Sequence, residues 1–242
     1  MIRSANIATM PSRLNQLSIM LESIYDQFDE IRICLNEFES VPKWLEEKEK
    51  VIIIIPDKDG EPYNATDNGK FAYCMSHARI GLDHEYYFTL DDDIVYPPNY
   101  VEETVKNIDT YGCIVTYHGR TLIGAGRGYY REHEVYHNQW EQKDSFEIDV
   151  AGTGVSAFRT DYFCPSEIAF SKYQCMSDLV FSLEAAKQGK TIGCCARPAQ
   201  WFKLLKAEDT IFDKFQGRLT EDQNKLADEI FNLRFEERNG NT

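Results

Sequence analysis

Short apolar segments alternate with amphipathic ones along the first half of the chain, and this alternation limits the fold more than any other feature. The strand-like segments are 2–9, 31–36, 51–56, 86–90 and 113–118. The segments between them are typical of helices, as in 11–28, where apolar side chains recur at three- and four-residue spacing. Strands that alternate with helices form a parallel sheet that helices cover. We therefore predict an α/β, Rossmann-like fold with a mixed, mostly parallel sheet and helices on both faces.

Two segments of this first half carry further expectations. The run VIIIIP at 51–56 is β-branched and apolar at successive positions, which predicts a strand covered on both faces. The segment 70–82 predicts a helix directly before the strand at 86–90.

The second half of the chain begins differently. Residues 119–148 are polar, aromatic and interrupted by glycines without clear periodicity, which predicts an active-site loop or an excursion with a hairpin. A helix is predicted over 177–190, ended by Gly189. A charged amphipathic helix is predicted from Thr220 onward.

Composition excludes several classes of partner. The formal net charge of the 242 residues is −14, which argues against nucleic acid and anionic lipid headgroups as main partners. The longest apolar run has five residues, so we expect no transmembrane segment, and the N-terminus lacks the apolar core of a signal peptide. The seven cysteines are scattered without a C-x-x-C pair, which indicates reduced thiols and a cytoplasmic protein.

Three consecutive aspartates, Asp91, Asp92 and Asp93, directly follow the apolar strand at 86–90. Crowded carboxylates raise one another's pKa unless a cation neutralises them. Mg²⁺ and Mn²⁺ typically bind one or two carboxylates and complete their coordination with water and substrate phosphates. Because ligands of parallel sheets bind beyond the carboxyl ends of the strands, the pattern favours a metal site there. The alternative is a solvated acidic turn, or a cap for the helix that begins near Pro97.

The acidic segment resembles the D-x-D region of nucleotide-sugar glycosyltransferases with the GT-A fold, especially those of the family 2 type. Residues 2 to about 200 follow the order of that family's motifs. The segments that carry the resemblance are IATMPSRLNQLSIMLESI, NGKFAYCMSHA, TLDDDIVYPPNY, AGTGVSAFR and SDLVFSLEAAKQGKTIGCCAR. It implies a glycosyltransferase domain over 1–205, with a nucleotide-binding half at 1–118 and an acceptor half at 119–205, and a C-terminal helical extension at 206–242.

The resemblance also implies site residues. Asp91 and Asp93 would bind Mn²⁺ or Mg²⁺, and Asp91 and Asp92 would also contact the nucleotide sugar. The remaining nucleotide-sugar contacts would come from Thr9, Arg13, Asn36, Asp57 and Lys70. The wall beside the acceptor or sugar would consist of Gly152, Thr153 and Gly154.

The general base implied by the resemblance is Asp178. It would take the proton of the acceptor hydroxyl in a single displacement that inverts the anomeric configuration. The family usually has Glu-Asp at this point, whereas this chain has Ser177 and Asp178. Because Asp178 begins a predicted helix, we expect the helix dipole to keep its pKa low, and the alternative is that it only caps that helix.

The function implied is transfer of a sugar from a nucleotide diphosphate sugar, most often a UDP-sugar, to a glycan, lipid-linked or protein-linked acceptor. Three alternatives stay open: a retaining enzyme on the same fold, a non-catalytic carbohydrate- or nucleotide-sugar-binding module, and a nucleotidyltransferase. The sequence GAGRG at 124–128 lacks the spacing and the following helix of a nucleotide loop. His118 is expected on the surface or in the core, and the alternative is a contact with the sugar or the metal. The aromatic residues of 129–140 form either a sugar-stacking platform or ordinary packing.

Overall fold

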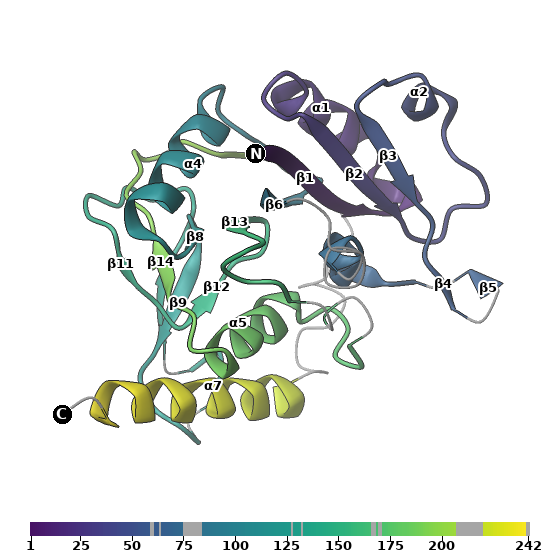
Figure 1. Ribbon diagram of the computed structural model, residues 1–242. Helices are drawn as coiled ribbons and strands as arrows, with labels where there is room; N and C mark the ends of the chain where they lie inside the picture. Colours follow the sequence, from purple (N-terminus) through teal and green to yellow (C-terminus); the bar gives the residue numbers. More distant parts are fainter. Residues whose placement is uncertain are drawn as a thin grey trace.

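The computed structural model describes residues 1–58, 61–62, 64–74, 84–126, 128–131, 133–165, 168, 171–206 and 220–240. Its centre is an eight-stranded sheet with the order β11-β14-β8-β13-β6-β1-β2-β3 (Figure 1). The strands are β1 (Ile2–Thr9), β2 (Glu30–Leu35), β3 (Val51–Ile54), β6 (Glu85–Asp91), β8 (Ile114–Thr116), β11 (Phe146–Glu147), β13 (Val155–Arg159) and β14 (Ile192–Cys194). Strands β3, β2, β1 and β6 run parallel, as do β8 and β14, whereas β13 and β11 are antiparallel to their neighbours. The predicted mixed, mostly parallel sheet is confirmed.

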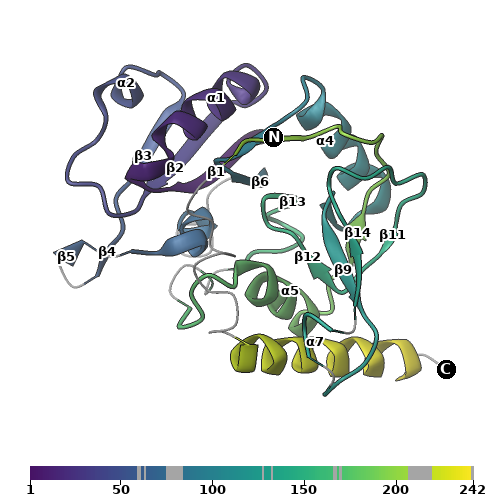
Figure 2. The ribbon, with the colours of Figure 1, turned by 180° about the vertical axis from the view of Figure 1, so that it is seen from behind.

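Helices lie on both faces of this sheet, as predicted. Helices α1 (Leu14–Ile24) and α4 (Tyr100–Tyr111) lie on one side, and α5 (Ser177–Lys187) and α7 (Thr220–Gly240) on the other, in two opposite views (Figures 1 and 2). The alternation of side chains along β6 produces this arrangement. Phe88 is buried among residues of α1 and α4, while its neighbour Tyr87 is buried in a second core with residues of α5 and α7.

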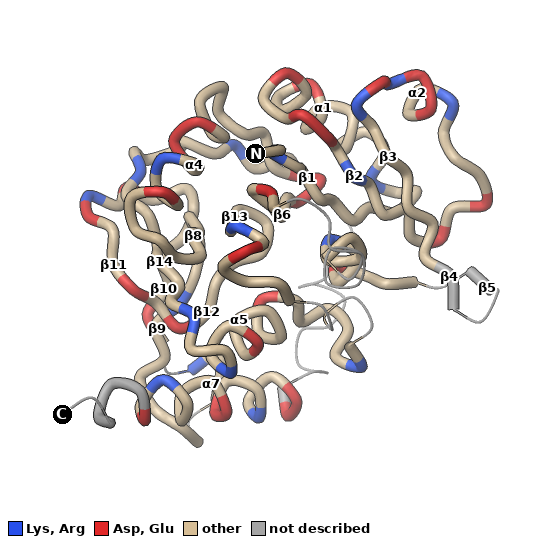
Figure 3. The backbone as a smooth tube through the Cα atoms, viewed as in Figure 1, with Lys and Arg blue, Asp and Glu red and all other residues tan. Residues whose placement is uncertain are grey.

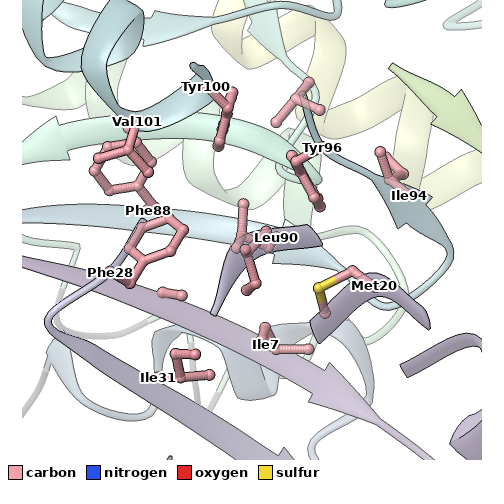
Figure 4. Close-up of a cluster of buried hydrophobic side chains, with 14 of the residues drawn as sticks. Ile7, Met20, Phe28, Ile31, Phe88, Leu90, Ile94, Tyr96, Tyr100 and Val101 are labelled. Atoms are coloured by element: carbon pink, nitrogen blue, oxygen red, sulfur yellow. The ribbon is translucent and has the colours of Figure 1, made fainter. Parts of the chain in front are cut away.

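The core under α1 and α4 supports the end of β6. Ile7, Met20, Phe88 and Leu90 pack together there (Figure 4). The rings of Phe28 and Phe88 meet edge to face with their centroids 5.0 Å apart. This packing fixes the carboxyl ends of β1 and β6, from which the acidic segment emerges.

The strand predicted at 51–56 differs from its expectation. β3 is the last strand of the large sheet, and all four of its residues are half-buried, while Ile55 is 49% exposed. Its apolar, β-branched sequence therefore belongs to an edge strand rather than to one covered on both faces. Val51 and Ile53 pack against the first core together with Trp44 of α2 (Lys43–Glu46).

The segment 119–148 contains the expected hairpin. Strands β9 (Gly119–Leu122) and β10 (His133–Tyr136) pair in antiparallel register, and β12 (Val150–Ala151) pairs with the other side of β9. Two further small pairs are β7 (Ile94–Val95) with β15 (Lys203–Leu204) and β4 (Asp57–Lys58) with β5 (Glu61–Pro62). Most of the helix predicted over 70–82 lies outside the described residues, which include only its first turn, at the end of the 3-10 helix η2 (Thr66–Phe71).

The predicted C-terminal helix is present as α7 and packs on α5. Leu226 and Ile230 are buried in the second core, and Lys187 of α5 pairs with Glu229 of α7 at 3.1 Å. Acidic and basic residues alternate along α7 (Figure 3). Gly189, with φ of 61°, follows the end of α5 as predicted. In the described part of the chain, no helix has the length and apolar character needed to cross a membrane.

Candidate functional site

The three aspartates lie where β6 ends and the turn to β7 begins. Asp91 ends β6, and Asp92 and Asp93 form the turn. Strand β15 pairs with β7, and the backbone N–H of Leu205 donates to the carbonyl of Asp93 at 2.7 Å. The buried hydroxyl of Tyr96 accepts from the N–H of Asp91 at 2.9 Å and donates to the carbonyl of Gly154 at 2.5 Å. The acidic turn is thus held at a fixed distance from the glycine-containing segment at 152–154.

Each aspartate has a partner from a different part of the chain. Lys70 Nζ pairs with Asp91 Oδ1. Arg13 Nη1 lies 3.1 Å from Asp93 Oδ2 and 3.9 Å from Asp92 Oδ1. The hydroxyl of Thr9, at the end of β1, donates to Asp92 Oδ2 at 2.7 Å. Thr9, Arg13 and Lys70, which were predicted to contact the nucleotide sugar, therefore all converge on the acidic turn.

The charges at this turn perturb one another. Burial, and then the neighbouring charge of Asp93, raise the pKa of Asp92 from 3.8 to about 7. Burial and the charge of Asp91 likewise raise the pKa of Asp93. Burial opposes the charge of Lys70, but the carboxylates of Asp91 and Asp67 outweigh it, so the pKa of Lys70 is raised. The positive charges of Arg13 and Lys70 thus do not fully neutralise the three carboxylates, and a site in that condition favours binding of a further cation.

Close packing brings Lys70 to this position. A Cβ added at Gly69 would lie 2.6 Å from the sulfur of Cys34 on β2, so only glycine lets η2 approach the sheet this closely. The buried side chain of Asn36 accepts from the N–H of Ala65 at 2.9 Å and donates to the carbonyl of Thr66 at 3.0 Å. Asn36 therefore fixes the start of η2.

Asp57, the remaining residue predicted to bind the nucleotide sugar, begins β4 in a small hairpin beyond β3. Its side chain lies outside the described part of the structure.

The predicted wall at 152–154 contacts three different groups in succession. A Cβ at Gly154 would lie 2.0 Å from Asp91 Oδ2, and one at Gly152 would lie 2.5 Å from the ring of His118. Between them, the N–H and the hydroxyl of Thr153 both donate to Asp178 Oδ1 at 2.7 Å. The two glycines are required because the carboxylate and the imidazole occupy the space of their missing side chains.

Asp178 is not the cap of its helix. The cap position of α5 is Met176, which has no side-chain cap hydrogen bond, and Asp178 lies in the first turn. Its two hydrogen bonds from Thr153 fall on Oδ1, so among the described residues its Oδ2 accepts none. The expectation of a low pKa is wrong: burial outweighs the bonds from Thr153, and the pKa of Asp178 is raised. Such a carboxylate is a stronger base than one at an exposed helix start.

One pocket of about 270 Å³ joins these groups. Asp91, Asp93 and Asp178 line it, and Asp92 does not. The other side chains and glycines that line it are Ile94, His118, His137, Asn138, Gly152, Gly154, Val155 and Leu204. The pocket lies beyond the carboxyl end of β6, where ligands of such sheets bind.

The donor set of the pocket fits the expected metal ion. Among the described residues, no group of three or more His, Cys, Asp and Glu side chains is arranged to hold a metal ion by itself. Mg²⁺ and Mn²⁺ need fewer protein ligands than that, because water and phosphate oxygens complete their coordination. Asp91 and Asp93, whose charges interact across the pocket, supply hard oxygen ligands of this kind.

Two pocket residues, His137 and Asn138, were not predicted from the sequence. His118, for which contact with the sugar or metal was only the alternative, also lines the pocket. Asp67 accepts from both the N–H and the hydroxyl of Ser177, at 3.1 and 2.6 Å, and so fixes the start of α5. The signal for His118 is its position at the end of the strand predicted over 113–118. Nothing in the aperiodic segment indicated His137 or Asn138.

Of the aromatic residues at 129–140, most serve packing. Tyr129 is buried under the guanidinium of Arg120, and Tyr136 packs on Phe146. Trp140 is 59% exposed and lies beside His137, with ring centroids 5.7 Å apart.

No protein-family model matches this chain, and no curated protein matches it significantly.

Proposed function

We propose that this protein is a metal-dependent glycosyltransferase that moves a sugar from a nucleotide diphosphate sugar, a UDP-sugar by preference, to an acceptor hydroxyl with inversion. The observation that carries the proposal is the single pocket that Asp91, Asp93 and Asp178 line at the carboxyl end of the parallel strands. The motif order that resembles GT-A enzymes, together with the mixed sheet flanked by helices, supports the same assignment.

The charged side chains at the pocket would have two different roles, one in binding the metal and the diphosphate and one in accepting the proton. Asp91 and Asp93 would bind Mn²⁺ or Mg²⁺, whose chemistry is to neutralise the charge that grows on the diphosphate as the glycosidic bond breaks. Lys70, paired with Asp91, would approach the same phosphates. Its buried position keeps the charge in place before the donor arrives.

Asp178 would act on the acceptor. Its Oδ2 would take the acceptor proton while the acceptor oxygen bonds to the anomeric carbon and the bond from that carbon to the diphosphate oxygen breaks. Thr153 fixes the carboxylate through Oδ1, so the second oxygen is directed by two hydrogen bonds rather than free to rotate. One displacement on the face opposite the leaving group inverts the configuration, and the leaving diphosphate needs no proton.

The test is a thermal-shift panel of nucleotide sugars with and without Mn²⁺, followed by product analysis of any stabilising donor. The proposal expects a donor whose stabilisation requires Mn²⁺, and release of the nucleoside diphosphate when an acceptor is added. Binding without sugar transfer or donor hydrolysis would indicate a binding module, and release of inorganic diphosphate would indicate a nucleotidyltransferase. The anomeric configuration of the product separates inversion from retention.

A further inference from the structure

The wall of the pocket contains a polar group that the described residues leave unsatisfied. Asn138 is only 6% exposed and lines the pocket, yet its Oδ1 has no hydrogen-bond partner among the described residues. A buried carbonyl oxygen without a donor is costly to fold. Such an atom at a pocket wall is explained by a ligand that supplies the donor.

Two histidines beside Asn138 extend this polar surface. The rings of His118 and His137 meet edge to face at 5.2 Å. The Nδ1 of His137 accepts from the N–H of Gln139 at 3.2 Å, which places the ring proton of the neutral form on Nε2. The carbonyl of His137 accepts from Arg197 Nη2 at 2.7 Å, which anchors the segment against the residues that follow β14.

These histidines present neutral rings at physiological pH. Burial, followed by the charges of His137 and Arg120, lowers the pKa of His118 to about 3. Burial and the charge of Arg197 lower the pKa of His137 as well. The neutral ring of His137 offers a donor at Nε2, because its Nδ1 already accepts from Gln139. The neutral ring of His118 offers one donor and one acceptor, and the side-chain amide of Asn138 offers both kinds of group. Sugar hydroxyls, which donate and accept, match such a surface.

The order of contacts along residues 152–154 indicates which substrate lies beside His118. Gly154 adjoins Asp91, Thr153 bonds to Asp178, and Gly152 adjoins His118. If the diphosphate lies at Asp91 and Asp178 takes the proton, His118 lies beyond the reacting oxygen, on the side away from the leaving group.

We propose that His118, His137 and Asn138 form the acceptor subsite and that the acceptor presented there is a neutral sugar ring. Its place as an acceptor subsite rests on the proposed function, whereas sugar binding itself does not. Leu204, 45% exposed, and Ile94 give the pocket an apolar side, and the exposed ring of Trp140 beside His137 offers a stacking face at the edge of this cluster. Carboxylated or phosphorylated acceptors are disfavoured, because three carboxylates line the same pocket.

Saturation-transfer NMR on the full chain tests this with methyl glycosides of glucose, galactose and N-acetylglucosamine, and with methyl glucuronide as the charged probe. At least one neutral glycoside should give ring-proton signals, and the glucuronide should give none. The signal should persist when UDP and Mn²⁺ are added, because the nucleotide is expected at Asp91 and Asp93 and not at the histidines. Absence of signal from every neutral glycoside, or displacement by UDP, overturns the proposal.

Variants identify the subsite. Asn138→Leu should weaken glycoside binding at least tenfold and leave the melting temperature unchanged or raised, because it removes an unsatisfied buried oxygen. His118→Phe keeps the ring contact with His137 and should weaken binding similarly, so the test does not depend on one variant. The exposed Asn99, at the cap of α4 without a side-chain cap bond, provides the control Asn99→Leu, which should bind normally. Unchanged binding in both pocket variants overturns the assignment.

Failure of the proposed function would look different. Asp93→Ala, which removes a metal ligand, should retain glycoside binding. If no nucleotide sugar binds with Mn²⁺ but a glycoside binds through Asn138, the sugar subsite stands and the glycosyltransferase assignment falls. If nucleotide sugars bind with Mn²⁺ and no glycoside binds, the glycosyltransferase assignment stands and the sugar subsite falls.

Discussion

The raised pKa of Asp92 makes the stability of the metal-free protein depend on pH in a way that one substitution should remove. The side chain is 12% exposed and bonded to Thr9, and its pKa rises from 3.8 to about 7 because of burial and then the charge of Asp93. The folded-state value lies above the unfolded one, so the carboxyl takes up a proton on folding. Its contribution to stability is therefore fully present below about pH 3.8 and is lost as the pH rises through about 7.

The size of the effect between pH 6 and pH 8 follows from these values. With a folded-state pKa of about 7, the carboxyl is about nine-tenths protonated at pH 6 and about one-tenth at pH 8, while the unfolded state is ionised at both. Folding therefore takes up about half a proton on average over two pH units. At about 1.4 kcal/mol per proton and pH unit, the free energy of unfolding is about 1.4 kcal/mol higher at pH 6 from this group. For a chain of this size, that corresponds to a melting-temperature difference of about 3–6 °C.

Asp92→Asn should remove this difference. The assay is thermal unfolding in EDTA at pH 6 and pH 8 for the wild type, Asp92→Asn and the control Asp29→Asn. Asp29 pairs with Arg3 on the surface, which lowers its pKa, so its loss should alter stability equally at both pH values. The lowered pKa of His118 acts in the opposite direction, but it does so in all three proteins and cancels in the comparison. A pH difference in Asp92→Asn equal to that of the wild type would refute the reasoning.

Three further perturbations address the reaction. Asp178→Asn should lower kcat by about 10²–10⁴-fold with little change in donor affinity, measured by steady-state release of the nucleoside diphosphate, and a near wild-type rate would show that the base lies elsewhere. Asp93→Ala should abolish the gain in UDP affinity that Mn²⁺ gives; calorimetry showing equal wild-type affinity in EDTA and in Mn²⁺ would contradict the metal site. Gly154→Ala would place a methyl group 2.0 Å from Asp91 Oδ2 and should displace that carboxylate, so the variant should bind UDP equally with and without Mn²⁺. Retention of a wild-type Mn²⁺ effect in the alanine variant would show that Asp91 can move without loss of the site.

The fold was predictable where local pattern and topology agree. Strand–helix alternation predicted the sheet and the helices on both faces because apolar strand-like segments are separated by amphipathic segments with the helical period. The edge position of β3 was not predictable from VIIII, because the same apolar, β-branched sequence suits any strand whose neighbours cover it. Which strand lies at the edge depends on how strands distant in the sequence pair with one another. The position of the antiparallel β13 between β6 and β8 is an example of such pairing.

The site was predictable in part, for a related reason. The three aspartates Asp91 to Asp93 follow a clear strand pattern, and their repeated charge identifies them as candidate site residues. Asn138 lies in an aperiodic segment, where no pattern distinguishes a single amide. The pKa of Asp178 was predicted in the wrong direction because the helix dipole can be inferred from sequence and burial cannot. The segment around Thr153 that encloses the carboxylate comes from a strand connection 25 residues away.

The partners of the three aspartates also explain how such a cluster can fold before any ligand is present. Arg13 and Lys70 approach from η1 (Pro11–Arg13) and η2, and together they carry two positive charges toward three carboxylates. The remaining imbalance is relieved at Asp92, the one member that does not line the pocket, by its raised pKa. Before a metal ion binds, a proton on Asp92 takes the place of a cation. Because a divalent cation lowers the pKa of nearby carboxyls, its arrival at Asp91 and Asp93 should release that proton, so Mn²⁺ should bind more tightly at pH 8 than at pH 6. Calorimetry of Mn²⁺ with UDP at the two pH values would detect this, and in Asp92→Asn the pH dependence should shrink while binding itself persists.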